Sequence, residues 1–104
     1  MLMEMRCYSF APGTIPDFLR LYEAEGLSLH RQHLGRLIGY FTADSGDVNQ
    51  LIHIWAFDDH TDRALRRAAL YSDHVWLTFA AKCAGMVQKM ETRFLTPTAF
   101  SPLR

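Results

Sequence analysis

The sequence lacks an excess of either charge and has too few cysteines for a disulfide framework. Eleven Lys and Arg balance eleven Asp and Glu, which argues against the basic surplus of proteins that bind nucleic acid or anionic membranes. A chain without net charge is poorly protected against association, so an oligomer interface is expected. The two cysteines, Cys7 and Cys83, lie in apolar surroundings and are predicted to be buried free thiols in a reducing compartment.

Long apolar runs are also missing. No run approaches the roughly 18 apolar residues that suggest a membrane span, and the start MLMEMRCY has no basic segment followed by an apolar core. We therefore expect a soluble, cytoplasmic protein. With 104 residues, of which 49% are hydrophobic, residues 1–104 should form a single domain around one core.

The hydrophobic periodicity predicts the order strand, helix, strand, strand, helix, strand. Strands are expected over 3–10, 36–42, 49–57 and 87–95, with a hairpin loop at 44–49. The first helix covers about 14–33 and bends near Gly26, where glycine weakens the helix. Residues 61–86 are helical in two parts, and Asp73 caps the second. Two prolines exclude regular structure from the tail, 95–104.

This order is the split βαβ pattern of ferredoxin-like domains. It predicts an α+β fold whose four-stranded antiparallel sheet has the first and third strands in the middle and the helices on one face. One face of the central strands is plain and apolar, with Met3, Met5, Cys7, Ile52, Ile54 and Ala56. This face suits packing against the helices. The other face mixes charges, rings and an imidazole: Glu4, Arg6, Tyr8, Phe10, Leu51, His53, Trp55 and Phe57.

The mixed face is predicted to be the open face of the sheet. Its aromatic side chains make it too apolar to lie in water, and its charges make it too polar for a dry core. A homodimer formed through this open face, with a partly polar cavity inside, meets both constraints. That arrangement is the dimeric α+β barrel.

Several separated motifs, in the same order, resemble the NIPSNAP family. They are EMRCYSFAPG at 4–13, GRLIGYFTADSGDVNQLIHIWAFDD at 35–59, RRAAL at 66–70, Asp73 with Trp76, and ETRFLTPTAFSP at 91–102. The resemblance implies a ferredoxin-like fold of the dimeric α+β barrel type, which cofactor-free small monooxygenases share. It also implies an uncharacterised molecular function, with neither a cofactor nor a metal.

The family pattern can be carried over position by position. It falls on Glu4, Arg6, Tyr8, Gly39, Asn49, Gln50, His53, Trp55, Glu91 and Arg93. The chain departs from that pattern at Tyr40 and Phe41, where relatives have a Trp-like aromatic, and at Thr92, where an Asn often precedes the late Arg. If that Asn polarises a ligand, its role does not transfer to this chain.

His53 is the centre of the predicted site because an imidazole titrates near neutrality. Parallel first and third strands would bring Glu4 or Arg6 within reach of it, and Arg6 could also pair with Glu91. Such a group suits an acidic or carbonyl-bearing ligand whose apolar part stacks on aromatic rings. The candidate ligand-binding residues are Glu4, Arg6, Tyr8, His53, Trp55, Phe57, Glu91 and Arg93.

Three interpretations of the mixed face stay open. The first is a satisfied polar network that fixes dimer register. The second is a site for a small, partly apolar molecule, and the third is a monooxygenase-like active site with His53 as general base. A different class is a protein-interaction module that docks a partner through its outer surface, including the 63–67 helix and the tail around Phe100.

Other patterns predict ordinary structure. His30 and His33 share a helix face without an acidic or cysteine partner, which indicates surface histidines and not a metal site. Arg63, Arg66 and Arg67 lie near three aspartates and predict a solvated helix with local ion pairs. Trp76 and Phe79 are expected in the core, with a pocket wall as the alternative.

Overall fold

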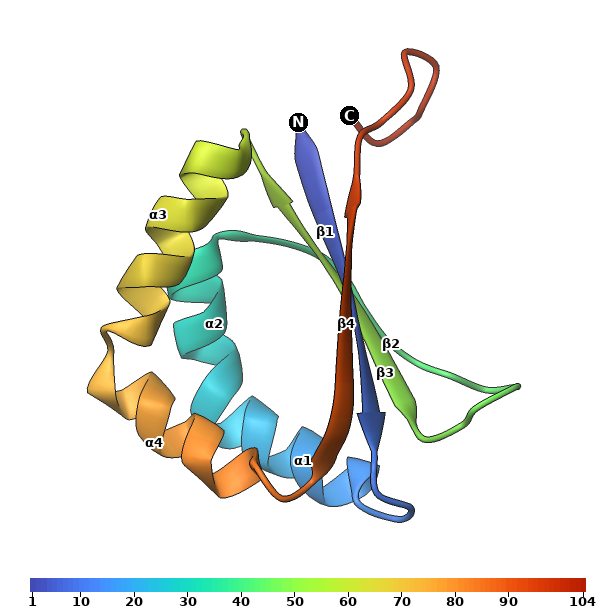
Figure 1. Cartoon of the computed structure of the whole chain (residues 1–104), viewed down its shortest axis with the longest axis vertical. Helices are drawn as coiled ribbons and strands as arrows, with labels where there is room; N and C mark the ends of the chain where they lie inside the picture. The colour runs from blue at the N-terminus through green and yellow to red at the C-terminus, as the bar shows by residue number, and fades with distance from the viewer.

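The computed structural model describes all 104 residues, and it shows an α+β fold in which the helices cover one face of a twisted sheet (Figure 1). The sheet has the order β2-β3-β1-β4, and every neighbouring pair is antiparallel. The strands are β1 (Leu2–Phe10), β2 (Arg36–Thr42), β3 (Gln50–Phe57) and β4 (Val87–Leu95). The ferredoxin-like fold predicted from the sequence is therefore confirmed, with the first and third strands in the centre.

The helical layer is formed by two segments of chain. The first contains α1 (Ile15–Leu21), the π-helical stretch η1 (Tyr22–Gly26) and α2 (Leu27–Leu34); the second contains α3 (His60–Tyr71) and α4 (His74–Cys83). None of these helices is both long and apolar enough to cross a membrane. The tail after β4 has no regular structure, as the prolines predict, and it leaves Phe100 exposed.

The predicted break between the two late helices is confirmed. The side chain of Asp73 accepts hydrogen bonds from the backbone N–H groups of Val75 and Trp76, at 2.9 and 3.4 Å, and thereby caps α4. His33 Nε2, at the end of α2, lies 2.8 Å from Asp73 Oδ2. This contact ties the start of α4 to the end of the first helical segment. The His33 hydrogen bond is also the main cause that lowers the pKa of Asp73.

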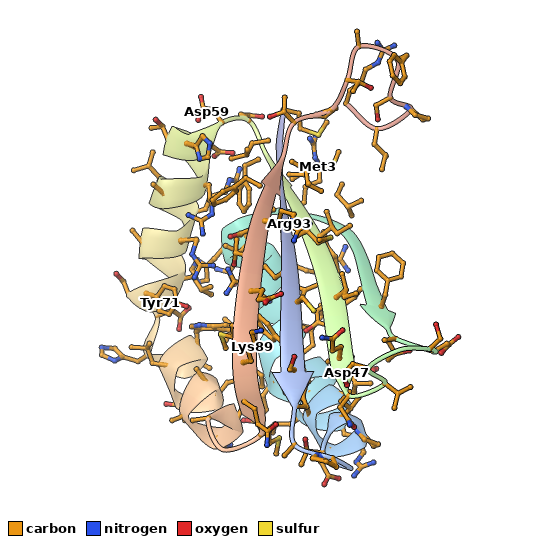
Figure 2. All side chains as sticks on the ribbon, turned by 45° about the vertical axis from the view of Figure 1, so that its right-hand side comes forward. Met3, Asp47, Asp59, Tyr71, Lys89 and Arg93 are labelled. Atoms are coloured by element: carbon orange, nitrogen blue, oxygen red, sulfur yellow. The ribbon has the colours of Figure 1, made fainter.

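The prediction that the mixed face is open is wrong. Glu4, Arg6, His53 and Trp55 are buried beneath the helices. The plain face, which includes Met5 and Ile54, has no helix over it, and Figure 2 shows Met3 and Arg93 on this open side. Alternation reveals that a strand has two faces but does not say which one the helices cover. Here the helices supply partners for the polar side chains of the mixed face, so this face can be buried.

A second expectation is corrected by the register of the central strands. β1 and β3 run antiparallel, not parallel, and Arg6 is the direct partner of His53. Glu4 is opposite Trp55 and Tyr8 is opposite Leu51. The predicted proximity of Arg6 to His53 therefore holds, because the sheet places them side by side on the face under the helices.

The change of helix type falls at Gly26, close to the predicted bend, and tight packing explains the glycine. A Cβ atom at this position would lie 2.8 Å from Cε2 of Phe79 on α4 and 3.0 Å from Cδ1 of Tyr22. Real Cβ atoms do not approach ring carbons so closely. Gly26 thus lets the first helical segment lie directly against the Phe79 ring.

We predict that Gly26→Ala lowers the free energy of unfolding by about 1–2 kcal/mol, because overpacking outweighs the better helix propensity of alanine. Urea denaturation measures this change. Gly85→Ala is the matched control, since a Cβ there meets nothing within 4 Å. A Gly26→Ala protein as stable as the wild type contradicts this account of the packing.

Candidate ligand-binding cavity

A cavity of about 400 Å³ lies between the helical layer and the β4 side of the sheet. It runs from an exposed rim to a buried floor. Tyr71 at the end of α3 and Lys89 on β4 belong to the rim and are labelled in Figure 2. Arg6, on the central strand β1, belongs to the floor and is only 7% exposed. The cavity therefore extends from solvent to a charged side chain inside the protein.

The walls of the cavity are mainly aromatic. Phe18 and Tyr22 stack with ring centroids 5.7 Å apart, and Trp76 packs against Phe79 at 5.3 Å. On α4 the aromatic side chains are followed by the smaller Ala80 and Cys83, and Ala84 comes directly after the helix; all three also line the cavity. Space is left beside β4 because these residues do not reach across to the strand. The sequence predicted that Trp76 and Phe79 are core residues, with a pocket wall as the alternative. Both descriptions hold, since each side chain is buried and each forms part of the cavity wall.

The floor is held by hydrogen bonds from Arg6. Its Nε donates to Tyr8 Oη at 3.0 Å, and its Nη1 donates to Glu4 Oε2 at 3.1 Å and to Thr92 Oγ1 at 3.2 Å. Burial by itself lowers the pKa of the guanidinium, but the charges and hydrogen bonds of Tyr8 and Glu4 outweigh it and raise that pKa. Arg6 is therefore a fixed positive charge at the floor.

Glu4 joins Arg6 to a second arginine that the sequence interpretation placed in solvent. Arg63, on α3, donates from Nε and Nη2 to Glu4 Oε2 at 3.1 and 2.7 Å, and its guanidinium also lies over the ring of Phe94. The expectation of a purely solvated 63–67 helix is thus wrong for Arg63. It holds for Arg66, which pairs with Asp62 on the surface. The polar floor is consequently connected to the helical layer.

His53 lies directly behind the cavity wall. Trp55 Nε1 donates to His53 Nδ1 at 2.8 Å. The His53 ring stacks on Tyr40 with centroids 4.5 Å apart and meets Tyr8 in a T-shaped contact with centroids 4.8 Å apart. Burial, together with the charge of Arg6, lowers the pKa of His53 to about 3. An indole N–H can only donate, so the neutral ring carries its proton on Nε2. In this state His53 has no free lone pair and is suited to donate a hydrogen bond, not to take a proton.

His30 is buried, so the prediction of a surface histidine is wrong. Its ring lies between Trp55 and Trp76, at 4.5 and 4.6 Å, and Nδ1 is 2.7 Å from Tyr22 Oη. Burial lowers the pKa of His30 to about 2, with further contributions from the charges of His53 and arginines. No group of three His, Cys, Asp or Glu side chains in the chain could hold a metal ion.

The predicted site residues divide into three groups. Arg6 and Tyr8 line the cavity; Glu4, His53 and Trp55 lie behind these residues as their hydrogen-bond partners or packing neighbours. Phe57 is buried in the core and does not line the cavity. Glu91 and Arg93 are opposite Cys7 and Met5 on β1, so they lie on the open face of the sheet. The prediction that Glu91 and Arg93 belong to the ligand site is therefore corrected, because this face is turned away from the cavity.

Sequence reasoning missed several cavity residues because they come from helices and from the edge strand β2. Tyr22, His30 and Tyr40 all line the cavity. Burial raises the pKa of both tyrosines well above the usual range, so they are neutral hydroxyl groups. In the sequence, Tyr22 shows only the apolar spacing of the first helix, and Tyr40 shows only a departure from the family pattern. Neither signal points to a cavity without the tertiary structure.

Taken together, these features define a class: a small ferredoxin-like domain with an aromatic cavity between its helices and sheet. Comparison with known proteins gives the family. The NIPSNAP family model matches residues 3–102. A NIPSNAP family protein with unknown function (Atu4242) from Agrobacterium tumefaciens is 41% identical, with a TM-score of 0.97, over 100% of this chain and 94% of that one. The chain belongs to the NIPSNAP family, as the sequence resemblance predicted.

Other comparisons set the limits of that identity. Protein NipSnap homolog 2 of Danio rerio is 30% identical over 99% of this chain, but the chain spans only 35% of that relative. An antibiotic biosynthesis monooxygenase has a TM-score of 0.65 at 17% identity, over 94% of this chain and 99% of its own. That likeness concerns the fold alone. The names of the NIPSNAP relatives assign no specific activity.

We predict that the two buried histidines make the protein sensitive to mild acid. Their pKa values of about 3 and about 2 in the folded chain lie far below the value near 6.5 of an unfolded histidine. The unfolded chain therefore binds more protons below about pH 6.5, so stability is complete above that pH and is lost as the pH falls toward about 3. Each histidine should account for about 2 kcal/mol of the loss between about pH 7.5 and pH 5.

Urea denaturation at these two pH values measures the effect. His30→Phe should remove about half of the histidine-dependent loss, because one of the two proton-binding sites of the unfolded chain is gone. His74→Gln, at an exposed position of α4, is the matched control. If His30→Phe leaves the pH dependence unchanged, His30 does not titrate as described.

Proposed function

We propose that this protein binds a small, partly apolar molecule in the cavity between the helices and the sheet of each protomer. One observation carries the proposal: the cavity has aromatic walls, a volume of about 400 Å³ and a buried guanidinium at its floor. Ligand sites in proteins are concave, mostly apolar and furnished with a few fixed polar groups. This cavity has each of those properties.

The roles of the candidate residues follow from their positions. Arg6 and Tyr8 would contact the ligand, since both line the cavity. Glu4 would hold the Arg6 guanidinium in place, while Trp55 would hold the His53 ring. The proposed site thus keeps Arg6 and Tyr8 from the sequence prediction, but its centre shifts from His53 to Arg6. It also moves from the space between two subunits to the interior of one.

Binding is favoured over catalysis by the state of His53. Its lone pair is occupied by the Trp55 N–H group, and its pKa is lowered to about 3 by burial and the charge of Arg6. A general base needs a free lone pair and a pKa nearer the working pH. The monooxygenase alternative has support only from a likeness of fold, which does not identify a function.

A neutral apolar dye tests whether the cavity accepts ligands. We expect phenylnaphthylamine to show a saturable rise in fluorescence with one site per chain, because the dye moves from water into the aromatic cavity. Ala80→Trp should abolish this signal, since Ala80 lines the cavity and a larger ring there fills it.

The control is Ala81→Trp, one position further along α4, where the alanine is exposed and does not line the cavity. This variant should bind the dye as the wild type does. Binding that survives in Ala80→Trp but is lost in Ala81→Trp, or no saturable binding to the wild type, rules out the cavity as the site.

We also propose that the protein is a homodimer formed through the open face of the sheet. That face has an apolar centre, with Met5, Cys7, Ile52 and Ile54, and Phe41 is 53% exposed beside it. Exposed apolar patches of this kind usually mark interfaces. Along β4 the same face has Glu91 and Arg93. A row with both signs can complement itself across a two-fold axis, which supports a second copy as the partner.

The mass in solution, from light scattering after gel filtration, should be that of a dimer for the wild type. Ile54→Lys should shift it to a monomer, because the interface would bury an unpaired charge. Val75→Lys is the control, since Val75 is exposed on α4 and away from the sheet. A monomeric wild type, or a dimer that survives Ile54→Lys, argues against this interface.

The reducing, cytoplasmic compartment expected from the sequence belongs to the same proposal. Cys7 and Cys83 are free thiols, and burial is the main cause that raises the pKa of both. Raised pKa values keep thiols protonated and poorly reactive. These properties support a compartment in which cysteines stay reduced.

A further inference from the structure

The charges at the cavity floor do not balance. Glu4 contributes one negative charge, and Arg6 and Arg63 contribute two positive charges that are both hydrogen-bonded to the same oxygen, Glu4 Oε2. Other ionisable groups around the floor are neutral: His30 and His53 have lowered pKa values, and Tyr22, Tyr40 and Cys83 have raised ones. The three charged groups at and behind the floor therefore carry a net positive charge of one, and Arg6 is the one of them that lines the cavity.

Some hydrogen-bond donors in and around the cavity have no partner in the protein. Trp76 lines the cavity, but its Nε1 is fully buried and without a partner, so this N–H does not reach the cavity surface. His53 Nε2 is buried without a partner just behind the wall formed by Tyr8 and Tyr40. On Arg6, Nε and Nη1 make the bonds described above, while Nη2 donates to no group of the protein.

The one buried side-chain oxygen without a partner is Glu4 Oε1, and Glu4 does not line the cavity because Arg6 lies in front of it. At the floor, a ligand therefore meets donor groups of Arg6 and no free carboxylate. A ligand that brings an acceptor to Arg6 gains a hydrogen bond that the protein itself does not make.

We infer that the cavity selects a small aromatic or conjugated carboxylate, whose anionic oxygens accept hydrogen bonds from Arg6 and whose apolar part lies among the aromatic walls. This inference rests on the proposed function and adds the chemical class of the ligand. A carboxylate matches the planar donor geometry of a guanidinium and neutralises the unbalanced charge of the floor. A conjugated body matches the rings of Phe18, Tyr22 and Phe79.

The test compares two ligands of the same shape, cinnamate and its neutral amide cinnamamide, by isothermal titration calorimetry near neutral pH. Wild-type protein should bind cinnamate at least about 10-fold more tightly than cinnamamide, as expected for a charge-assisted hydrogen bond. Arg6→Met should bring the two affinities within about 2-fold of each other, because the charge is gone while the side-chain volume is nearly kept.

A control variant and a second ligand separate this effect from a loss of folding. Arg20→Met is the matched control, since Arg20 is an exposed surface residue on α1 paired with Asp17, and it should keep the full preference for cinnamate. Arg6→Met should still bind phenylnaphthylamine, because the aromatic walls of the cavity are unchanged.

The outcomes distinguish this inference from the function on which it rests. Equal affinity for the two ligands, or no cinnamate binding by protein that binds phenylnaphthylamine, overturns the carboxylate inference and leaves the apolar site standing. If neither ligand nor the neutral dye binds the wild type, the inference and the proposed function both fall.

Discussion

The structure depends on the burial of two charged side chains on the first strand. Glu4 and Arg6 point under the helices, where an unpaired charge would cost several kcal/mol. Their pairing with each other is completed by Arg63 from α3 and Thr92 from β4. Because the network joins β1 to α3 and to β4, it can form only when the second helical segment and the edge strand β4 are in place. It therefore links the local structure of β1 to the position of α3.

The same constraint explains why the domain contains a cavity. The floor is fixed by the polar network, and the first helical segment is held close to α4 by the contact of Gly26 with Phe79. On the far side, α4 presents Ala80 and Cys83 toward β4, with Ala84 directly after the helix. Because the contact between Phe79 and Gly26 fixes the position of α4, its small side chains do not reach β4. The space beside β4 is thus a result of helix placement combined with small residues, and not of missing core volume.

The elements of the fold could be predicted from the sequence because their signals are local. Alternation marks the strands, Asp73 caps α4, and Gly26 marks the change of helix type. The site could be predicted only in part, because its partners are distant in the chain. Arg63 lies 59 positions from Glu4, and nothing near Arg63 in the sequence distinguishes it from Arg66. The face assignment failed for the same reason, since burial of the mixed face depends on donors that the helices bring.

The corrected faces change what a dimer would mean for this protein. In the sequence interpretation one face served both as the interface and as the site, so a ligand would lie between two subunits. In the structure β1 separates these roles, because Arg6 faces the cavity while Met5 and Cys7 lie on the open side. Association through the open face would therefore leave the cavity of each protomer with its rim between α4 and β4 unobstructed. Two sites per dimer would result, and they could influence each other only through the shared strands of the sheet.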